Sequence, residues 1–135
     1  MAIARIRAAF DYPLETVWKV VTSLEDTSWR SDIAGLDILK PGKTFVEHTP
    51  DGIATTFTVT ALEPCRRYAF DMENSNMKGC WTGLFSEEED LTVLEFIEDV
   101  QAKKWYMKPF VTRYLKKQQE GYIADLRKKL DRSET

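Results

Sequence analysis

Few side chains in this sequence could carry acid–base chemistry, and three of them stand out. His48 is the only histidine among 135 residues, and it follows Glu47 in a segment expected to be extended. An unperturbed imidazole titrates at about pH 6.5, so His48 is a chemically plausible general base. Strand alternation places only one of the two side chains on the inner face, and the sequence leaves open which. With Tyr114 as a possible partner acid, Glu47, His48 and Tyr114 are weak catalytic candidates.

Other reactive groups lack the context that their chemistry requires, and no metal or cofactor is expected. A single histidine without clustered thiols or carboxylates cannot complete a zinc site. The acidic run 87–90 lacks the spaced ligands and the glycine of a calcium loop. The run Gly79-Cys80-Trp81-Thr82-Gly83 lacks the flanking pattern of a nucleophile elbow or phosphate loop, and Cys80 is expected to be a small buried thiol.

Length and composition limit the class of protein. With 135 residues, 43% apolar and 30% charged, the chain is predicted to form one globular domain over residues 1–135. No run approaches the roughly 18 apolar residues of a membrane span, so stable membrane insertion is not expected. Arginines at positions 5 and 7 argue against a signal peptide, and two cysteines are too few for a disulfide scaffold. Both features favour a cytoplasmic location.

The two ends of the sequence differ in charge. Residues 1–100 hold 9 basic and 18 acidic side chains, whereas residues 101–135 hold 10 basic and 4 acidic ones. Such asymmetry can mark a nucleic-acid or lipid surface, or simply the solvated face of one basic helix. We favour the helix and expect no nucleic-acid partner, because the net charge is −3 whereas nucleic-acid-binding domains are usually basic.

The first third of the chain is predicted to form one strand and two short helices. Residues 2–10 read as a strand that ends in the turn Asp11-Tyr12-Pro13. Apolar residues at 3-4 spacing then predict a short amphipathic helix over residues 13–22, with proline at its first position. Capping pairs of serine and aspartate between residues 23 and 32 predict a second, shorter helix or turn around residues 25–30.

Between residues 34 and 99 the apolar period changes from 3.6 to 2. Strands are predicted at 35–40, 43–49, 53–63, 66–73, 76–86 and 91–99, with turn residues in each break. The short breaks favour antiparallel hairpins. Residues 53–61 alternate apolar side chains with threonines, which indicates a sheet with one face in water and one face covered. Gly79 and Gly83 on one strand indicate either a hollow or a bend.

The remainder, about 105–131, is predicted to be one long helix that packs on the covered face of the sheet. Its apolar stripe runs through Val111, Leu115, Gln118, Tyr122 and Leu126. Gln118 lies at the centre of this stripe, and an unpartnered buried amide costs about 1–3 kcal/mol. Gln118 therefore needs a bond across the core, a water or a ligand.

This order of elements resembles the START-like superfamily, which includes polyketide cyclases, lipid-transfer domains and relatives of the birch pollen allergen. The resemblance covers nearly the whole chain and rests on four segments. These are residues 10–18 (Phe10 to Trp18), Trp29 before Ile33, residues 60–64 (Thr60 to Pro64), and the last hairpin from Gly79-Cys80-Trp81 to Thr92-Val93. The resemblance implies an α+β helix-grip fold, in which a curved seven-stranded antiparallel sheet wraps around a long C-terminal helix.

The resemblance further implies an elongated apolar cavity between sheet and helix, and no universal catalytic residue. Aromatic residues make up 12% of the chain, and several of them are placed to line one interior, with or without a hole. The ligand-binding candidates are Trp29, Phe57, Tyr68, Phe70, Trp81, Phe110, Tyr114 and Gln118.

Three functions follow as hypotheses. The first is noncatalytic binding or transport of a hydrophobic small molecule such as a lipid, a sterol or an aromatic polyketide. The second is a cyclase or dehydratase that acts on such a molecule, which rests on analogy of fold. The third is a protein-binding role, like that of co-chaperone relatives, through the basic helix. The ligand and the oligomeric state, monomer or dimer, stay open.

Overall fold

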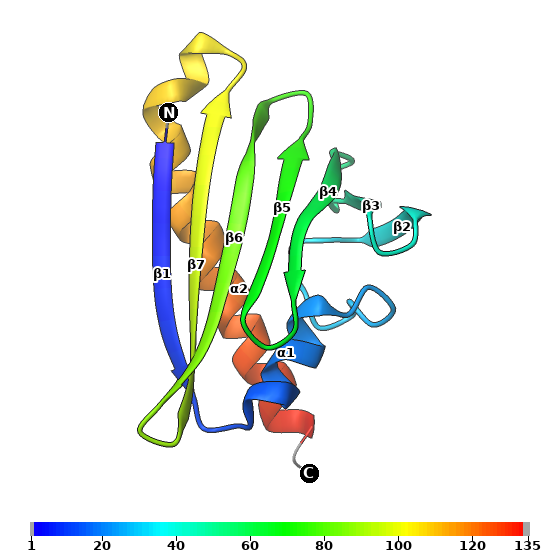
Figure 1. Ribbon diagram of the computed structural model, residues 1–135. Helices are drawn as coiled ribbons and strands as arrows, with labels where there is room; N and C mark the ends of the chain where they lie inside the picture. The colour runs from blue at the N-terminus through cyan, green and yellow to red at the C-terminus, as the bar shows by residue number, and fades with distance from the viewer. Residues whose placement is uncertain (1, 134–135) are drawn as a thin grey trace.

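A computed structural model describes residues 2–133 and shows one curved sheet with a long helix across it (Figure 1). The strands are β1 (Ala2–Phe10), β2 (Gly35–Lys40), β3 (Thr44–His48), β4 (Ala54–Glu63), β5 (Arg67–Glu73), β6 (Met77–Glu88) and β7 (Leu91–Ala102). The helices are α1 (Leu14–Thr22), the 3-10 helix η1 (Trp105–Phe110) and α2 (Val111–Ser133). The seven strands pair antiparallel in the order β1-β7-β6-β5-β4-β3-β2. The predicted helix-grip fold is therefore confirmed.

Of the two alternatives predicted for residues 25–30, the short helix is wrong and the turn is what the structure shows. The segment between α1 and β2 consists of turns and bends, because its polar side chains bond the backbone locally. The Asp26 carboxylate accepts a bond from the Ser28 amide at 3.3 Å, and the Trp29 indole donates to the Asp26 carbonyl at 3.2 Å. Such bonds compete with the i→i+4 ladder that a helix needs.

The C-terminal helix also begins later than predicted. Residues 105–110 form the separate 3-10 helix η1, and the α-helical ladder starts at Val111. Pro109 accounts for the break, because proline has no amide hydrogen to donate and disfavours α geometry at the residue before it.

Helix α2 lies over one side of the sheet, above β1 and β7. Its buried residues are Val111, Leu115, Gln119, Ile123, Leu126 and Leu130. The predicted stripe was therefore rotated: Gln119 and Ile123 are fully buried, whereas Gln118 and Tyr122 are half-buried. Gln119 donates to the Ala4 carbonyl at 3.1 Å, which ties α2 to the edge strand β1. Helix α2 consequently leaves the inner face of the strands from β6 to β2 uncovered.

Neither glycine of β6 opens a hollow. A Cβ atom on Gly83 would lie 2.6 Å from the Trp81 indole, so the ring occupies the space that a side chain would take. A Cβ atom on Gly79 would lie 2.3 Å from the Asp99 carbonyl oxygen and 2.8 Å from the Val100 Cα of β7. Gly83 therefore leaves room for the Trp81 ring, and Gly79 lets the backbone of β7 lie close to β6.

We expect Gly79→Ala to lower the free energy of unfolding by about 1–3 kcal/mol, because the backbone of β7 must move. Gly121→Ala is the matched control, since Gly121 is exposed on α2 and its added methyl group meets nothing within 4 Å. Higher helix propensity should make this control more stable by about 0.5–1 kcal/mol. Urea unfolding measures both variants, and equal stabilities would contradict the close approach.

Candidate functional site

A cavity of about 540 Å³ lies between α2 and the uncovered part of the sheet. Strands β3 to β7, the loop after α1, the 3-10 helix η1 and α2 all contribute to its wall. All eight side chains predicted to bind a ligand line this cavity: Trp29, Phe57, Tyr68, Phe70, Trp81, Phe110, Tyr114 and Gln118. These eight residues therefore line the same cavity, and their role in binding stays a prediction.

The sheet side of the cavity is a wall of aromatic rings. Phe70 and Trp81 stack at 4.8 Å with 4° between their planes, and Phe57 meets Phe70 edge-on at 4.9 Å. Trp81 also contacts Phe96 of β7 at 4.7 Å. Alternation along each strand brings these rings to one face. The result is a rigid apolar surface against which a flat or chain-like molecule can pack.

One row of side chains, from the last residue of η1 along α2, faces this wall. Residues Phe110, Tyr114, Gln118 and Tyr122 follow one another at intervals of four, so they lie along one side of the helix. Phe110 and Tyr114 are 67% and 51% exposed, which places them at the mouth of the cavity. Among residues 2–133, no partner hydrogen-bonds the half-buried Gln118 side chain, so its amide is available to a ligand.

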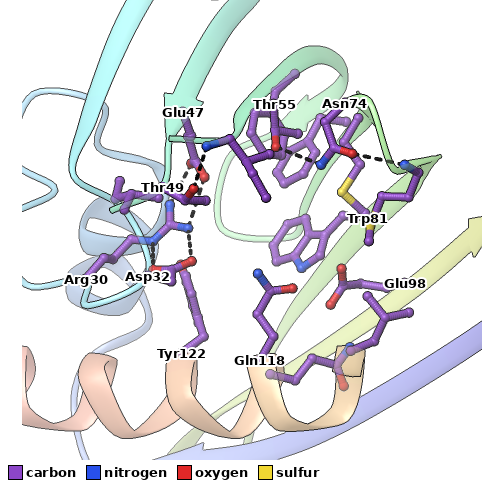
Figure 2. A pocket seen from close by; sticks show the side chains of 18 of the residues that line it. Arg30, Asp32, Glu47, Thr49, Thr55, Asn74, Trp81, Glu98, Gln118 and Tyr122 are labelled. Atoms are coloured by element: carbon purple, nitrogen blue, oxygen red, sulfur yellow. Dashed lines mark hydrogen bonds and ion pairs between the residues drawn. The ribbon is translucent and has the colours of Figure 1, made fainter. Parts of the chain in front are cut away.

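An ion-pair cluster closes the cavity at the loop after α1 (Figure 2). Arg30 donates to Glu47 at 2.7 and 3.1 Å, and to Asp32 at 3.1 and 2.7 Å. Its guanidinium also lies 5.2 Å from the centre of the Tyr122 ring, within range of a cation–π contact. Burial alone would lower the pKa of Arg30, but Glu47 and Asp32 raise it, so the guanidinium stays charged.

Three tyrosines of the cavity, Tyr68, Tyr114 and Tyr122, have raised pKa values. Burial raises the pKa of Tyr68 to about 12, and burial also raises the pKa of Tyr122. Both rings therefore present hydroxyl groups rather than phenolates. Burial raises the pKa of Tyr114 as well, with smaller contributions from nearby carboxylates.

Glu98 is a buried acid in the wall of the cavity that no cation neutralises. It lies on β7, opposite Trp81 of β6, and only 7% of the residue is exposed. No ion pair reaches it from residues 2–133. Burial is the main effect on the pKa of Glu98, which is raised to about 7. A hydrogen bond with Gln119 acts in the opposite direction, and the charge of Asp32 adds to the rise. Glu98 is therefore poised to exchange a proton near neutral pH.

The three catalytic candidates separate in the structure. Glu47 faces the cavity but is held by Arg30. His48 points to the other face of the sheet, where its Nε2 lies 2.8 Å from a carboxylate oxygen of Asp37. Tyr114 is at the mouth. Glu47 and Tyr114 thus line the same cavity, whereas His48 lies outside it.

Arg30 and Glu98 were missed by sequence reasoning. Glu98 alternates with the buried Phe96 and Val100, which is a signal that it faces inward. Arg30 lies in an irregular loop, where no periodicity indicates its direction. The expectation that Cys80 is buried is wrong, because Cys80 alternates with inward-facing Trp81 and is exposed on the outer face.

The sequence matches a known protein family over nearly its whole length. Residues 1–131 match the family described as polyketide cyclase / dehydrase and lipid transport. The chain belongs to this family. A search of curated proteins found no significant match. Within residues 2–133, no helix is long and apolar enough to cross a membrane, and no group of three potential metal ligands occurs.

Solved structures share the fold at low sequence identity. A START superfamily protein from Mycobacterium smegmatis has a TM-score of 0.88 at 14% identity, with 98% of this chain and 99% of that chain covered. Protein MLL2253 from Mesorhizobium loti has a TM-score of 0.79 at 15% identity, covering 96% and 97%. DynU16, a protein of the dynemicin biosynthetic locus, has a TM-score of 0.77 at 16% identity, and the match covers 97% of this chain but 48% of that one.

The Arg30 cluster should contribute strongly to stability. Arg30→Met leaves two carboxylates facing each other without a cation, so the free energy of unfolding should fall by about 3–5 kcal/mol. Arg67→Met is the matched control, because the exposed Arg67 pairs with Glu63 at 3.7 Å in solvent and should cost less than about 1 kcal/mol. Similar losses in urea unfolding of the two variants would contradict the role given to Arg30.

Glu98 should make stability depend on pH. Its folded-state pKa of about 7 exceeds its ordinary value of 4.5, so the folded chain holds a proton that the unfolded chain releases. The contribution of Glu98 to the free energy of unfolding must then fall as the pH rises from 4.5 through 7. Glu98→Gln should remove that fall and exceed the wild type by about 1–3 kcal/mol at pH near 8. Urea unfolding across this range tests it, with Glu95→Gln on the outer side of β7 as control.

Proposed function

We propose that the protein binds a hydrophobic small molecule in the cavity between α2 and the sheet. The observation that carries the proposal is the unfilled space of about 540 Å³, enclosed by aromatic side chains from strands far apart in the sequence. A volume of this size falls within the roughly 300–1,000 Å³ of small-molecule sites. Membership in a family that includes lipid transport supports the same conclusion.

The arrangement of polar groups supports binding over mere imperfect packing. Arg30 and Asn74 are fixed by partners, since Asn74 donates to Thr55 at 3.1 Å and accepts from two amides of the following turn. The Gln118 side chain, in contrast, faces the cavity without a partner among the described residues. A wall of apolar rings with a few convergent polar groups is typical of a ligand site.

Filling the cavity should abolish binding. N-Phenyl-1-naphthylamine, an uncharged dye that fluoresces in apolar surroundings, serves as the probe. Gln118→Trp places an indole in the cavity and should weaken dye binding by about tenfold or more. Lys117→Trp, one position along the helix and exposed, should bind like the wild type. Native mass spectrometry against a lipid and sterol panel then searches for the ligand, and a wild type that binds neither dye nor panel would overturn the proposal.

A second candidate is a cyclase or dehydratase, and Glu98 is the observation that favours it. Aldol cyclisation and dehydration both begin with removal of a proton from carbon next to a carbonyl, and a carboxyl group with a pKa near 7 suits that step. Glu98 takes the place of Glu47 and His48 in this hypothesis, because the former is held by Arg30 and the latter lies outside the cavity.

Deuterium exchange tests this second function. The bicyclic ketone 2-tetralone, in D₂O buffer, exchanges the protons next to its carbonyl slowly, and NMR follows the rate. An enzyme should accelerate the exchange by about 10²-fold or more, and Glu98→Gln should remove the acceleration. Equal rates with wild type and variant would leave ligand binding as the function.

The cytoplasmic location, the single-domain organisation and the absence of a nucleic-acid partner stay predictions.

A further inference from the structure

The charged side chains that line the cavity are nearly all acidic. The cation is Arg30, and the acids among the described lining residues are Asp32, Glu47, Asp51, Glu73 and Glu98. Glu73, at the rim, is paired with Lys103 of the β7–η1 segment at 2.7 Å. Among the lining residues that the structure describes there is no lysine. The wall thus holds five acidic groups against one cation, an excess that disfavours a guest of negative charge.

Arg30 is not available to hold an anion. Its nitrogens already make four hydrogen bonds to Asp32 and Glu47, and the Tyr122 ring covers it. A ligand carboxylate would have to displace one of these acids while standing beside the other. Bidentate pairs of this kind are strong when desolvated, so such an exchange is unfavourable.

A second part of the wall is rich in hydrogen-bond acceptors. Glu98 points into the cavity from β7, and Gln118 points toward the same space from α2 (Figure 2). Gln119, beside them, is only 3% exposed, and its side-chain amide N–H donates a hydrogen bond to the Ala4 carbonyl oxygen. The Oε1 atom of the same side chain is buried and has no hydrogen-bond partner among the described residues. An orphaned buried acceptor is costly, and a donor group on a ligand would satisfy it.

We propose that the cavity selects apolar molecules that carry a basic amine, with the ring system against the aromatic wall and the ammonium beside Glu98 and Gln119. This inference rests on the proposed function and adds to it the charge class of the ligand. The unmatched negative charge, the occupied guanidinium and the orphaned acceptor each point to a cationic donor. Aromatic rings tolerate such a guest, because their faces attract cations.

Glu98 couples this selectivity to pH. Around its carboxyl group are Gln119 and Gln118 of α2, Trp81 of β6, and, farther away, Asp32 and Tyr114. Asp32, which forms an ion pair with Arg30, repels the ionised form of Glu98. A bound ammonium would stabilise the ionised form. Amine binding should therefore release a proton and become tighter as the pH rises through 7.

Three naphthalenes of matched shape test the inference: 1-naphthylmethylamine, 1-naphthylmethanol and 1-naphthoate. Each competes with the uncharged dye N-phenyl-1-naphthylamine. At about pH 8 the amine should bind at least tenfold more tightly than the carboxylate, with the alcohol between them. If the dye binds but the carboxylate binds as well as the amine, the inference fails while the proposed function stands. If neither the dye nor any naphthalene binds, the proposed function itself fails.

Glu98→Gln separates the role of this acid from that of the whole cavity. The variant keeps the size of the side chain but cannot ionise, so the amine preference is measured relative to the affinity of the same variant for the dye. Its preference for the amine should fall to about threefold or less, and the tightening of amine binding between about pH 6 and pH 8 should disappear. Glu95→Gln should keep the wild-type preference. An amine preference and pH dependence that survive in Glu98→Gln would overturn the assignment of Glu98.

Discussion

The hydrogen bond from Gln119 to the Ala4 carbonyl, together with one from Arg127 to the Ala9 carbonyl at 3.0 Å, holds α2 along the β1 edge of the sheet. A helix is about 10 Å wide, so one placed there cannot also cover the strands beyond β6. The sheet curves, and the loop around Arg30 meets the far side of α2 through Tyr122. The space between these contacts is the cavity. Its existence is thus a consequence of where one helix is anchored.

The elements of the fold were predictable because their periods are local and strong. The strands 2–10 and 35–40 were placed at their observed bounds, and the other strands differ by at most three residues at an end. The errors lie where side chains compete with the backbone or where proline intervenes, as at Asp26 and Pro109. These outcomes depend on which of several possible hydrogen bonds forms, and periodicity does not contain that information.

The apolar half of the cavity wall was predictable, and of the polar half only Glu47, Tyr114 and Gln118 were among the candidates. Aromatic residues at alternating strand positions predict an aromatic interior, and all of the chosen rings line the cavity. The polar half depends on pairs formed across large distances in sequence, such as Arg30 with Glu47. The rotation of α2 by one residue, which buries Gln119 and leaves Gln118 facing the cavity, depends on packing that a helical stripe does not resolve.

The four tryptophans are distributed in a way that gives the protein an optical signal of its own. Trp29 and Trp81 are almost fully buried in the wall of the cavity, and Trp18 packs behind it against Phe85 at 4.8 Å. Trp105, on η1, is 79% exposed, so its emission should resemble that of indole in water. Because indole emission follows the polarity around the ring, replacing Trp105 by phenylalanine leaves a chain whose intrinsic fluorescence comes from the cavity and its supporting layer. Occupancy then becomes visible without a label.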